Sequence, residues 1–134
     1  MARVKKVAIF PFRNLTKNPH AREIVTQIFL AELGKSERFE IEELGNIVDF
    51  MVEQRLRIGA SLDRPRLRVL RRRYKIDAAI LGNILAFGEK DGVPYINLTV
   101  RMVTTDTGEI IWKACIERNG DDYIKILDIG KIRS

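Results

Sequence analysis

The stretch YINLTVRMVTTDTGEIIW, residues 95–112, decides the fold of this chain. Apolar and polar side chains alternate from Tyr95 to Val103, which is the pattern of a β-strand with one buried face. Asp106-Thr107-Gly108 then joins this run to a second β-rich run, as expected of a hairpin. The stretch therefore predicts two antiparallel neighbouring strands.

The segments before this stretch extend the prediction to a whole sheet. An apolar run at 76–87 precedes a four-residue turn at 89–92, so the strands 76–87, 94–105 and 109–118 form an antiparallel meander. Apolar side chains at three-and-four spacing predict helices. The remaining elements are a strand at 4–12, a helix capped by Asn18 and ended by Gly34, a strand at 38–42, a helix ending near Gly59, and a helix opened by Asp63 and Pro65.

The predicted order is β-α-β-α-α-β-β-β, an α/β sandwich with helices packed on a mixed sheet. We expect residues 7–12 in the interior of the sheet, and Ile28 and Phe29 in the core. The side chains expected to face or flank the helices are Ile80, Leu98 and Ile110.

Length and composition indicate one domain, residues 1–134, with 46% hydrophobic and 31% charged residues. The tail 119–134 carries apolar residues at helical spacing and predicts the start of a further helix. No apolar run approaches the roughly 18 residues of a membrane-spanning helix, and the N-terminus lacks the pattern of a signal peptide. We expect a cytoplasmic location if Met1 is the native start.

The residues that usually carry chemistry are scarce. His20 and Cys115 are the only histidine and the only cysteine, too few for a zinc site, a Ser-His-Asp triad or a redox pair. We expect His20 to be solvated in the first turn of a helix and Cys115 to be buried as a small hydrophobe. The sequence predicts no catalytic residue, no metal and no cofactor, and therefore no enzyme.

Other polar residues have structural interpretations. The loop 12–18 lacks the glycines of a phosphate cradle, so we expect its asparagines and Thr16 to close the loop and cap the helix. Asp77 is expected to cap the turn into its strand or to pair with an arginine. Trp112 is expected to pack under a helix, and Glu42-Glu43 to be a solvated end.

Four short motifs occur in an order that is similar to a family of bacterial envelope proteins, which includes CsgG, the N-terminal domain of TolB, and LpoB. The motifs are Pro11-Phe12 with Asn14, Val52-Glu53-Gln54, Asp77-Ala78 with Gly82, and Thr107-Gly108-Glu109 with Trp112. The resemblance covers roughly residues 4–118. It implies a non-catalytic adaptor or assembly component of the periplasm or outer membrane that binds a protein partner and is compatible with a homo-oligomer. The short turns leave no room for the long hairpins of CsgG, which argues against a secretion pore.

One helix is unusually basic. Residues 55–75 hold nine basic residues and one acid, a net charge of +8, whereas the whole chain carries +6. The remainder is therefore mildly acidic. Leu67, Leu70 and Tyr74 form the inner stripe of the helix 63–75, with Arg71 at its border. The predicted partner-binding patch consists of Arg64, Arg66, Arg68, Arg72 and Arg73.

We hypothesise that this patch meets an acidic protein, lipid headgroups or a phosphate backbone, because guanidinium groups suit carboxylates and phosphates alike. An alternative function is a cytoplasmic nucleic-acid-binding module that uses the same helix. Against this alternative, the chain lacks an RNP-type aromatic pair, a GXXG loop and a helix-turn-helix. A solvated, mildly self-repelling helix face is the simplest interpretation of all.

Overall fold

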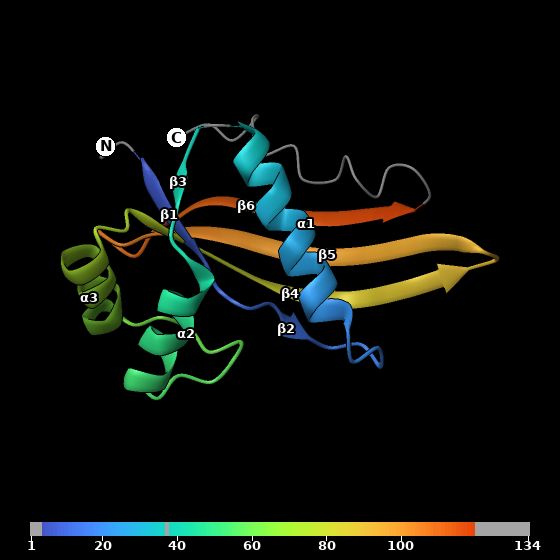
Figure 1. Cartoon of the computed structure of the whole chain (residues 1–134), viewed down its shortest axis with the longest axis horizontal. Coiled ribbons are helices and arrows are strands. Elements are labelled where there is room, and N and C mark those ends of the chain that lie inside the picture. Colours follow the sequence, from blue (N-terminus) through green and yellow to red (C-terminus); the bar gives the residue numbers. More distant parts are fainter. Residues whose placement is uncertain (1–3, 37, 120–134) are drawn as a thin grey trace.

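The computed structural model describes residues 4–36 and 38–119, and the predicted tail helix lies outside these residues. A six-stranded mixed sheet has the order β3-β1-β4-β5-β6, with β2 paired to β4. Three helices pack on it, which confirms the predicted fold class (Figure 1). The elements are β1 (Lys6–Ile9), β2 (Arg13–Asn14), α1 (Ala21–Ser36), β3 (Glu40–Ile41), α2 (Leu44–Glu53), α3 (Arg64–Tyr74), β4 (Ala78–Lys90), β5 (Val93–Thr104) and β6 (Ile110–Asn119).

The predicted meander is confirmed, since β4 to β6 pair antiparallel in sequence order. The turn between β4 and β5 is shorter than predicted. It contains only Asp91 and Gly92, with φ angles of 53° and 79°. Positive φ at both positions is typical of the two-residue turn that matches the twist of a hairpin.

The predicted first strand, 4–12, is interrupted. β1 lies parallel between β3 and β4 in the interior of the sheet, as expected, but it ends at Ile9. Pro11 has no N–H and cannot continue the ladder. The chain then returns to β4 through β2, where Arg13 pairs with Asn83.

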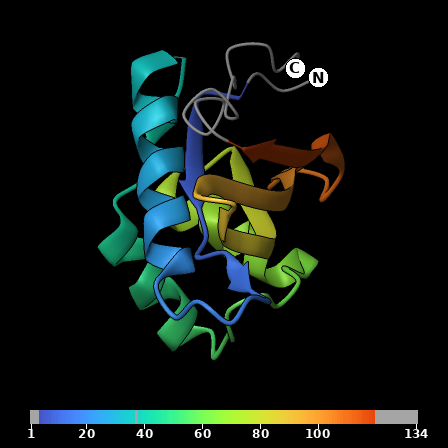
Figure 2. The same ribbon diagram turned by 90° about the vertical axis from the view of Figure 1, so that its right-hand side faces the viewer.

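The two faces of the sheet carry separate apolar clusters. Helix α1 covers one face of the sheet, and α2 and α3 cover part of the other face. Helices α2 and α3 lie at the end of the sheet opposite the tip of the β4–β5 hairpin (Figure 1). Figure 2, viewed from that hairpin end, shows α1 running along one side of the twisted sheet. The side chains of β5 alternate as predicted, and Ile96, Leu98, Val100 and Met102 are buried on the α1 side.

Helix α1 differs from its prediction in two respects. It continues past Gly34 to Ser36, so Gly34 lies inside the helix and does not end it. Its buried apolar side chains follow an i, i+4 spacing, namely Ala21, Val25, Phe29 and Leu33. Phe29 is fully buried against Phe12, whereas Ile28 is only half-buried and Ile24 is 41% exposed.

Helix α2 is shorter than predicted, because it ends at Glu53 and not near Gly59. Arg55 adopts φ of 56°, which is incompatible with a continuing right-handed helix. The buried residues are Ile47, Phe50 and Met51, while Val48 and Val52 are exposed. The loop that follows faces residues of β4 and β5 before α3 begins.

Several side chains have environments that their sequence neighbourhood did not predict. Cys115 lies on β6 at the edge of the sheet and is exposed, so its predicted burial was wrong. Ile110 on the same strand is 54% exposed, but it pairs with Val103 of the cluster that contains α3 side chains, which agrees with the prediction that it flanks the helices. Glu43 is exposed as predicted, but Glu42 is not solvated, since its carboxylate forms a salt bridge of 3.0 Å with Lys6. Trp112, by contrast, is partly buried against the cluster that contains the side chains of α1, which agrees with the prediction that it packs under a helix.

Asp77 serves neither of its predicted roles. Its Oδ2 accepts the backbone N–H groups of Lys5 and Lys6 at 2.9 and 3.0 Å. The carboxylate thus ties the entry of β4 to the start of β1. No helix within 4–36 and 38–119 is long and apolar enough to cross a membrane.

Candidate functional site

Helix α3 forms as predicted and projects its arginines outward. The Asp63 carboxylate accepts the Arg66 N–H at 3.1 Å and caps the N-terminus, and Pro65 lies in the first turn. Leu67 and Leu70 are buried against the sheet. At the other end, Lys75 adopts a left-handed conformation, with φ of 61°, and closes the helix.

The structure divides the predicted arginine patch into two groups, of which the first pairs within the protein. Arg66 Nη1 lies 2.8 Å from Asp63 Oδ2, and its Nη2 donates to the Gln54 carbonyl at 3.1 Å. Arg73 donates to Glu53 and lies over the Tyr74 ring. The hydrogen bond to Glu53, reinforced by the charge of its carboxylate, raises the pKa of the Arg73 guanidinium. Arg73 and Arg66 thus link α3 to the end of α2, and Arg66 also pairs with the capping residue of α3.

The second group lines a groove beside α3. Five cationic side chains form one wall, and the turn between β5 and β6 forms the other, beside α3 in Figure 1. We call this feature the α3 groove; its cations are Arg64, Arg68, Arg71, Arg72 and Lys75, and its second wall is Thr105, Asp106, Thr107 and Gly108. It encloses about 410 Å³.

The α3 groove is strongly positive. Among its lining residues Asp106 is the only acid, so the groove carries a formal charge of +4. Within the described part of the chain, none of the five cations takes part in a salt bridge. Arg64, Arg68 and Arg72 also follow each other at i, i+4, where like charges repel.

Buried contacts hold the two walls together. The Thr105 hydroxyl donates to the Ile76 carbonyl at 2.7 Å, and the Thr105 N–H donates to the Asp77 carbonyl at 3.0 Å. A Cβ at Gly108 would lie 3.5 Å from Leu67, so the turn approaches the buried side of α3 directly. These contacts therefore fix the position of the turn against α3.

Arg71 is the deepest cation of the groove. The residue is half-buried, and its Nη1 is fully buried without a hydrogen-bond acceptor among the described residues. An unpaired buried donor is costly, more so on a charged group. The patch predicted from the sequence did not include Arg71 and Lys75. The groove that brings them together with the other cations depends on a second wall about 30 positions further along the chain, which the helix sequence alone does not show.

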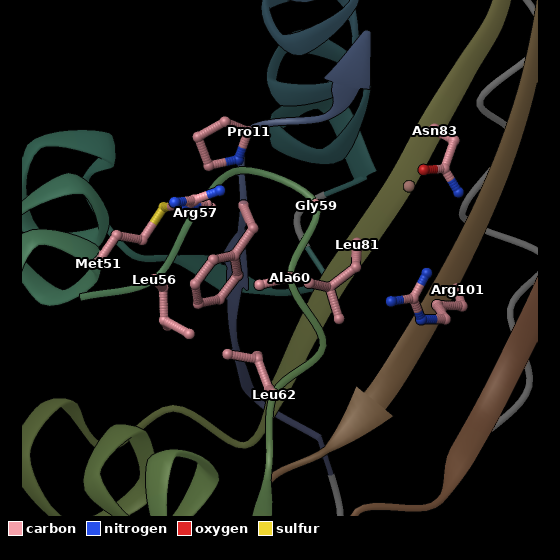
Figure 3. Close-up of a pocket in the computed structure, with 12 residues that line it drawn as sticks. Pro11, Met51, Leu56, Arg57, Gly59, Ala60, Leu62, Leu81, Asn83 and Arg101 are labelled. Atoms are coloured by element: carbon pink, nitrogen blue, oxygen red, sulfur yellow. The ribbon is translucent and has the colours of Figure 1, made fainter. Parts of the chain in front are cut away.

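A smaller pocket lies between the sheet and the loop that follows α2 (Figure 3). Leu56, Leu62 and Met51 line one side, while Arg101 and Asn83 extend from the strands on the other. Its free space of about 10 Å³ is at most that of one water molecule. No histidine, cysteine or acid lines it, so it offers no set of catalytic groups.

The loop 12–18 closes on itself, as predicted. Asn14 Nδ2 donates to the Asn18 carbonyl at 2.7 Å, and Asn14 Oδ1 accepts the Thr16 N–H at 3.0 Å. Asn18 Oδ1 accepts the N–H of His20, which is exposed just before α1. Across residues 4–36 and 38–119, no three His, Cys, Asp or Glu side chains lie close enough to hold a metal.

The sequence matches no protein-family model and none of the curated proteins. Solved structures do match the fold. The lipoprotein GNA1162 from Neisseria meningitidis is 12% identical with a TM-score of 0.66, and covers 92% of each chain. A PelC dodecamer from Paraburkholderia phytofirmans is 17% identical with a TM-score of 0.63, over 98% of this chain and 87% of PelC.

The C-terminal domain of LpoB from Escherichia coli is 15% identical with a TM-score of 0.57, over 86% of this chain and 83% of that domain. TolB from Acinetobacter baumannii also matches, over 26% of its length. The predicted likeness to LpoB and TolB is thus confirmed at the level of the fold, and the likeness to CsgG stays a prediction.

Proposed function

We propose that this chain is a non-catalytic domain of the bacterial cell envelope, an adaptor or assembly component that binds a protein partner through the α3 groove. The fold shared with LpoB and the lipoprotein GNA1162 supports the envelope assignment, at the periplasm or the outer membrane. The observation that carries the binding role is the row of five cations without a salt bridge in the described part of the chain.

The contrast between the two groups of arginines strengthens this proposal. Arg66 and Arg73 each have a carboxylate within the protein. The cations of the groove repel one another along the helix. Arg71 Nη1 and Arg66 Nε are both buried without an acceptor among the described residues, but only Arg71 also lacks a salt bridge there. An arrangement that destabilises the free protein is typical of a surface that functions by binding.

The absence of a catalytic constellation supports an adaptor role over an enzyme. His20 precedes α1, and Cys115 lies on the edge strand β6, so the two belong to different elements. Neither has partners for nucleophilic or acid–base chemistry among the hydrogen bonds and ion pairs of the described residues, apart from the backbone contact of His20. His20→Ala and Cys115→Ser should therefore leave partner binding unchanged.

A nucleic-acid-binding module is the second candidate, because the same guanidinium groups pair well with phosphates. The lining of the α3 groove contains no aromatic side chain on which a base could stack. Phosphate contacts alone would give binding without base selection. The protein-partner function is therefore preferred.

Photo-cross-linking in cells tests the proposed function. A photoreactive amino acid replaces Arg68 in the groove or, as a control, the exposed Gln27 on α1. The protein is produced from its complete native gene. We expect a cross-linked protein in the envelope fraction from position 68 and not from position 27. Fractionation with the cytoplasm, or cross-links to nucleic acid, would contradict the proposal.

A further inference from the structure

Resting on the proposed function, we infer that the α3 groove binds an acidic segment of the partner protein, and that Ile110 supplies an apolar contact beside it. The inference names the chemistry of the partner: several carboxylates with one large apolar side chain next to them. It depends on the charge of the groove, on its concave shape, and on the position of Ile110.

The charge of the groove fits carboxylates. Four of its five cations are arginines, whose planar guanidinium groups donate two parallel N–H hydrogen bonds to a carboxylate. Asp106 offsets only one of the five charges. Arg71 retains a buried Nη1 without an acceptor in the described residues, and a ligand carboxylate that reaches it would satisfy that donor.

Ile110 lies beside the groove on the same side of the sheet. It pairs across the strands with Val103, which packs in the cluster that contains Leu67 and Leu70 of α3. Cross-strand partners project to the same face. Ile110 is nevertheless 54% exposed, and it follows the Thr105–Gly108 wall by two residues. A large apolar side chain next to unpaired cations is typical of a protein-binding surface.

The geometry favours a peptide over a membrane or a nucleic acid. A groove of about 410 Å³ between a helix and a turn admits several side chains of an extended segment. A flat bilayer surface would reach only the outer cations, and the half-buried Arg71 would remain unpaired. A single strand of nucleic acid would need stacking partners, which the groove lining lacks.

Fluorescence anisotropy with a labelled peptide tests the inference on the full 134-residue chain. The probe is Asp-Glu-Glu-Leu-Glu-Glu-Asp, and the control peptides replace every acid by its amide, or Leu by Ser. The double variant Arg68→Gln/Arg72→Gln removes two groove charges. Its matched control, Lys17→Gln/Lys35→Gln, removes two charges from exposed lysines outside the groove lining.

We expect the groove variant to weaken peptide binding about tenfold or more, and the lysine control to weaken it less than about twofold, because close charge pairs outweigh the net charge of the protein. Binding should fall steeply with salt for the wild type and weakly for the groove variant. The amide peptide should not bind.

A second variant tests the apolar contact. Ile110→Thr keeps a β-branched residue on the edge strand, and its melting temperature reports whether the fold is intact. We expect it to weaken binding of the Leu peptide about threefold to tenfold, because the loss of an apolar contact the size of one or two methylene groups changes the affinity by about this factor. Binding of the Ser peptide should be unchanged.

Three outcomes would overturn the inference. The first is equal loss of peptide binding in the groove variant and the lysine control. The second is selective loss, in the groove variant, of binding to a single-stranded oligonucleotide or to phosphatidylglycerol vesicles but not to the peptide. The third is a wild-type protein that self-associates in sedimentation experiments and a groove variant that does not, because a second copy of the chain would then be the ligand of the groove.

The two proposals fail differently. If a partner still cross-links at position 68 in cells, but the groove variant binds the peptide as tightly as the wild type, the inference is overturned and the proposed function still stands. Groove-dependent peptide binding without any envelope partner overturns the proposed function instead.

Discussion

The hydroxyl of Thr105 donates a buried hydrogen bond of 2.7 Å to the carbonyl of Ile76. Thr105 belongs to the turn between β5 and β6, and Ile76 lies between α3 and β4. This bond and the bond from the Thr105 N–H to the Asp77 carbonyl attach the turn to the segment that follows α3, and so hold the two walls of the α3 groove next to each other. The turn that forms one wall of the groove is thus anchored in the buried part of the protein through Thr105.

Thr105→Val should lower the free energy of unfolding by about 1–3 kcal/mol, because the Ile76 carbonyl would lose its buried donor. Thr105→Ser keeps the hydroxyl and should lose less than about half as much. Urea denaturation of both variants measures the difference. Equal stability of the valine and serine variants would show that the hydrogen bond contributes nothing.

Phe29→Ala should cost about 3–5 kcal/mol, since the ring is fully buried against Phe12. Ile28→Ala should cost about 1–2 kcal/mol, because its side chain is only half-buried. Ile24→Ala is the matched control on the exposed side of α1 and should change stability by less than about 0.5 kcal/mol. Thermal melts that rank Ile24 with Phe29 would contradict the packing described for α1.

Two glycines should respond to alanine in opposite directions. Gly34 lies inside α1 with open space around it, so Gly34→Ala should stabilise the protein by about 0.5–1 kcal/mol. A Cβ at Gly82 would lie 2.6 Å from the Thr99 carbonyl oxygen and 2.7 Å from the Phe12 ring. Gly82→Ala should therefore destabilise by about 1–3 kcal/mol or more. Stabilisation by both would place Gly82 in a looser environment than the structure shows.

Arg68→Gln should stabilise the free protein at low salt by about 0.4–1 kcal/mol, because Arg68 stands between Arg64 and Arg72 at i, i+4. The gain should shrink toward zero at 1 M salt, where the screening length falls to about 3 Å. Lys17→Gln, a change at an exposed loop residue, should show no such salt dependence. Melting temperatures across a salt series measure both. A salt-independent Arg68 variant would indicate that the helix does not suffer charge repulsion.

The strand meander and the basic helix could be predicted from sequence because their signals are local. Alternation along residues 95–103 fixes which side chains of β5 face the core, and Asp63 with Pro65 marks the start of α3. The break at Pro11 was foreseeable from its missing N–H, but the return of the chain to the same strand through β2 depends on β4, some 70 residues away.

The groove could not be predicted in full, because it joins distant segments. A helical wheel places Arg64, Arg68 and Arg72 on the outer face of α3, yet it carries no information on the turn at 105–108. The same limit explains Ile110 and Cys115. Both occur in a strand of ordinary apolar character, and only the position of β6 at the sheet edge leaves them exposed. The pairing of Arg73 with Glu53 likewise depends on how α2 and α3 pack.

The central claim is that an acidic protein segment occupies the α3 groove, and NMR mapping with the Asp-Glu-Glu-Leu-Glu-Glu-Asp peptide tests it most directly. In ¹⁵N-labelled protein, we expect the largest amide shifts at Arg68, Arg71 and Arg72, across Thr105–Gly108, and at Ile110, with α1 unchanged. Shifts that spread evenly over all exposed lysines and arginines, or that centre on α1 or on the loop 12–18, would contradict the claim.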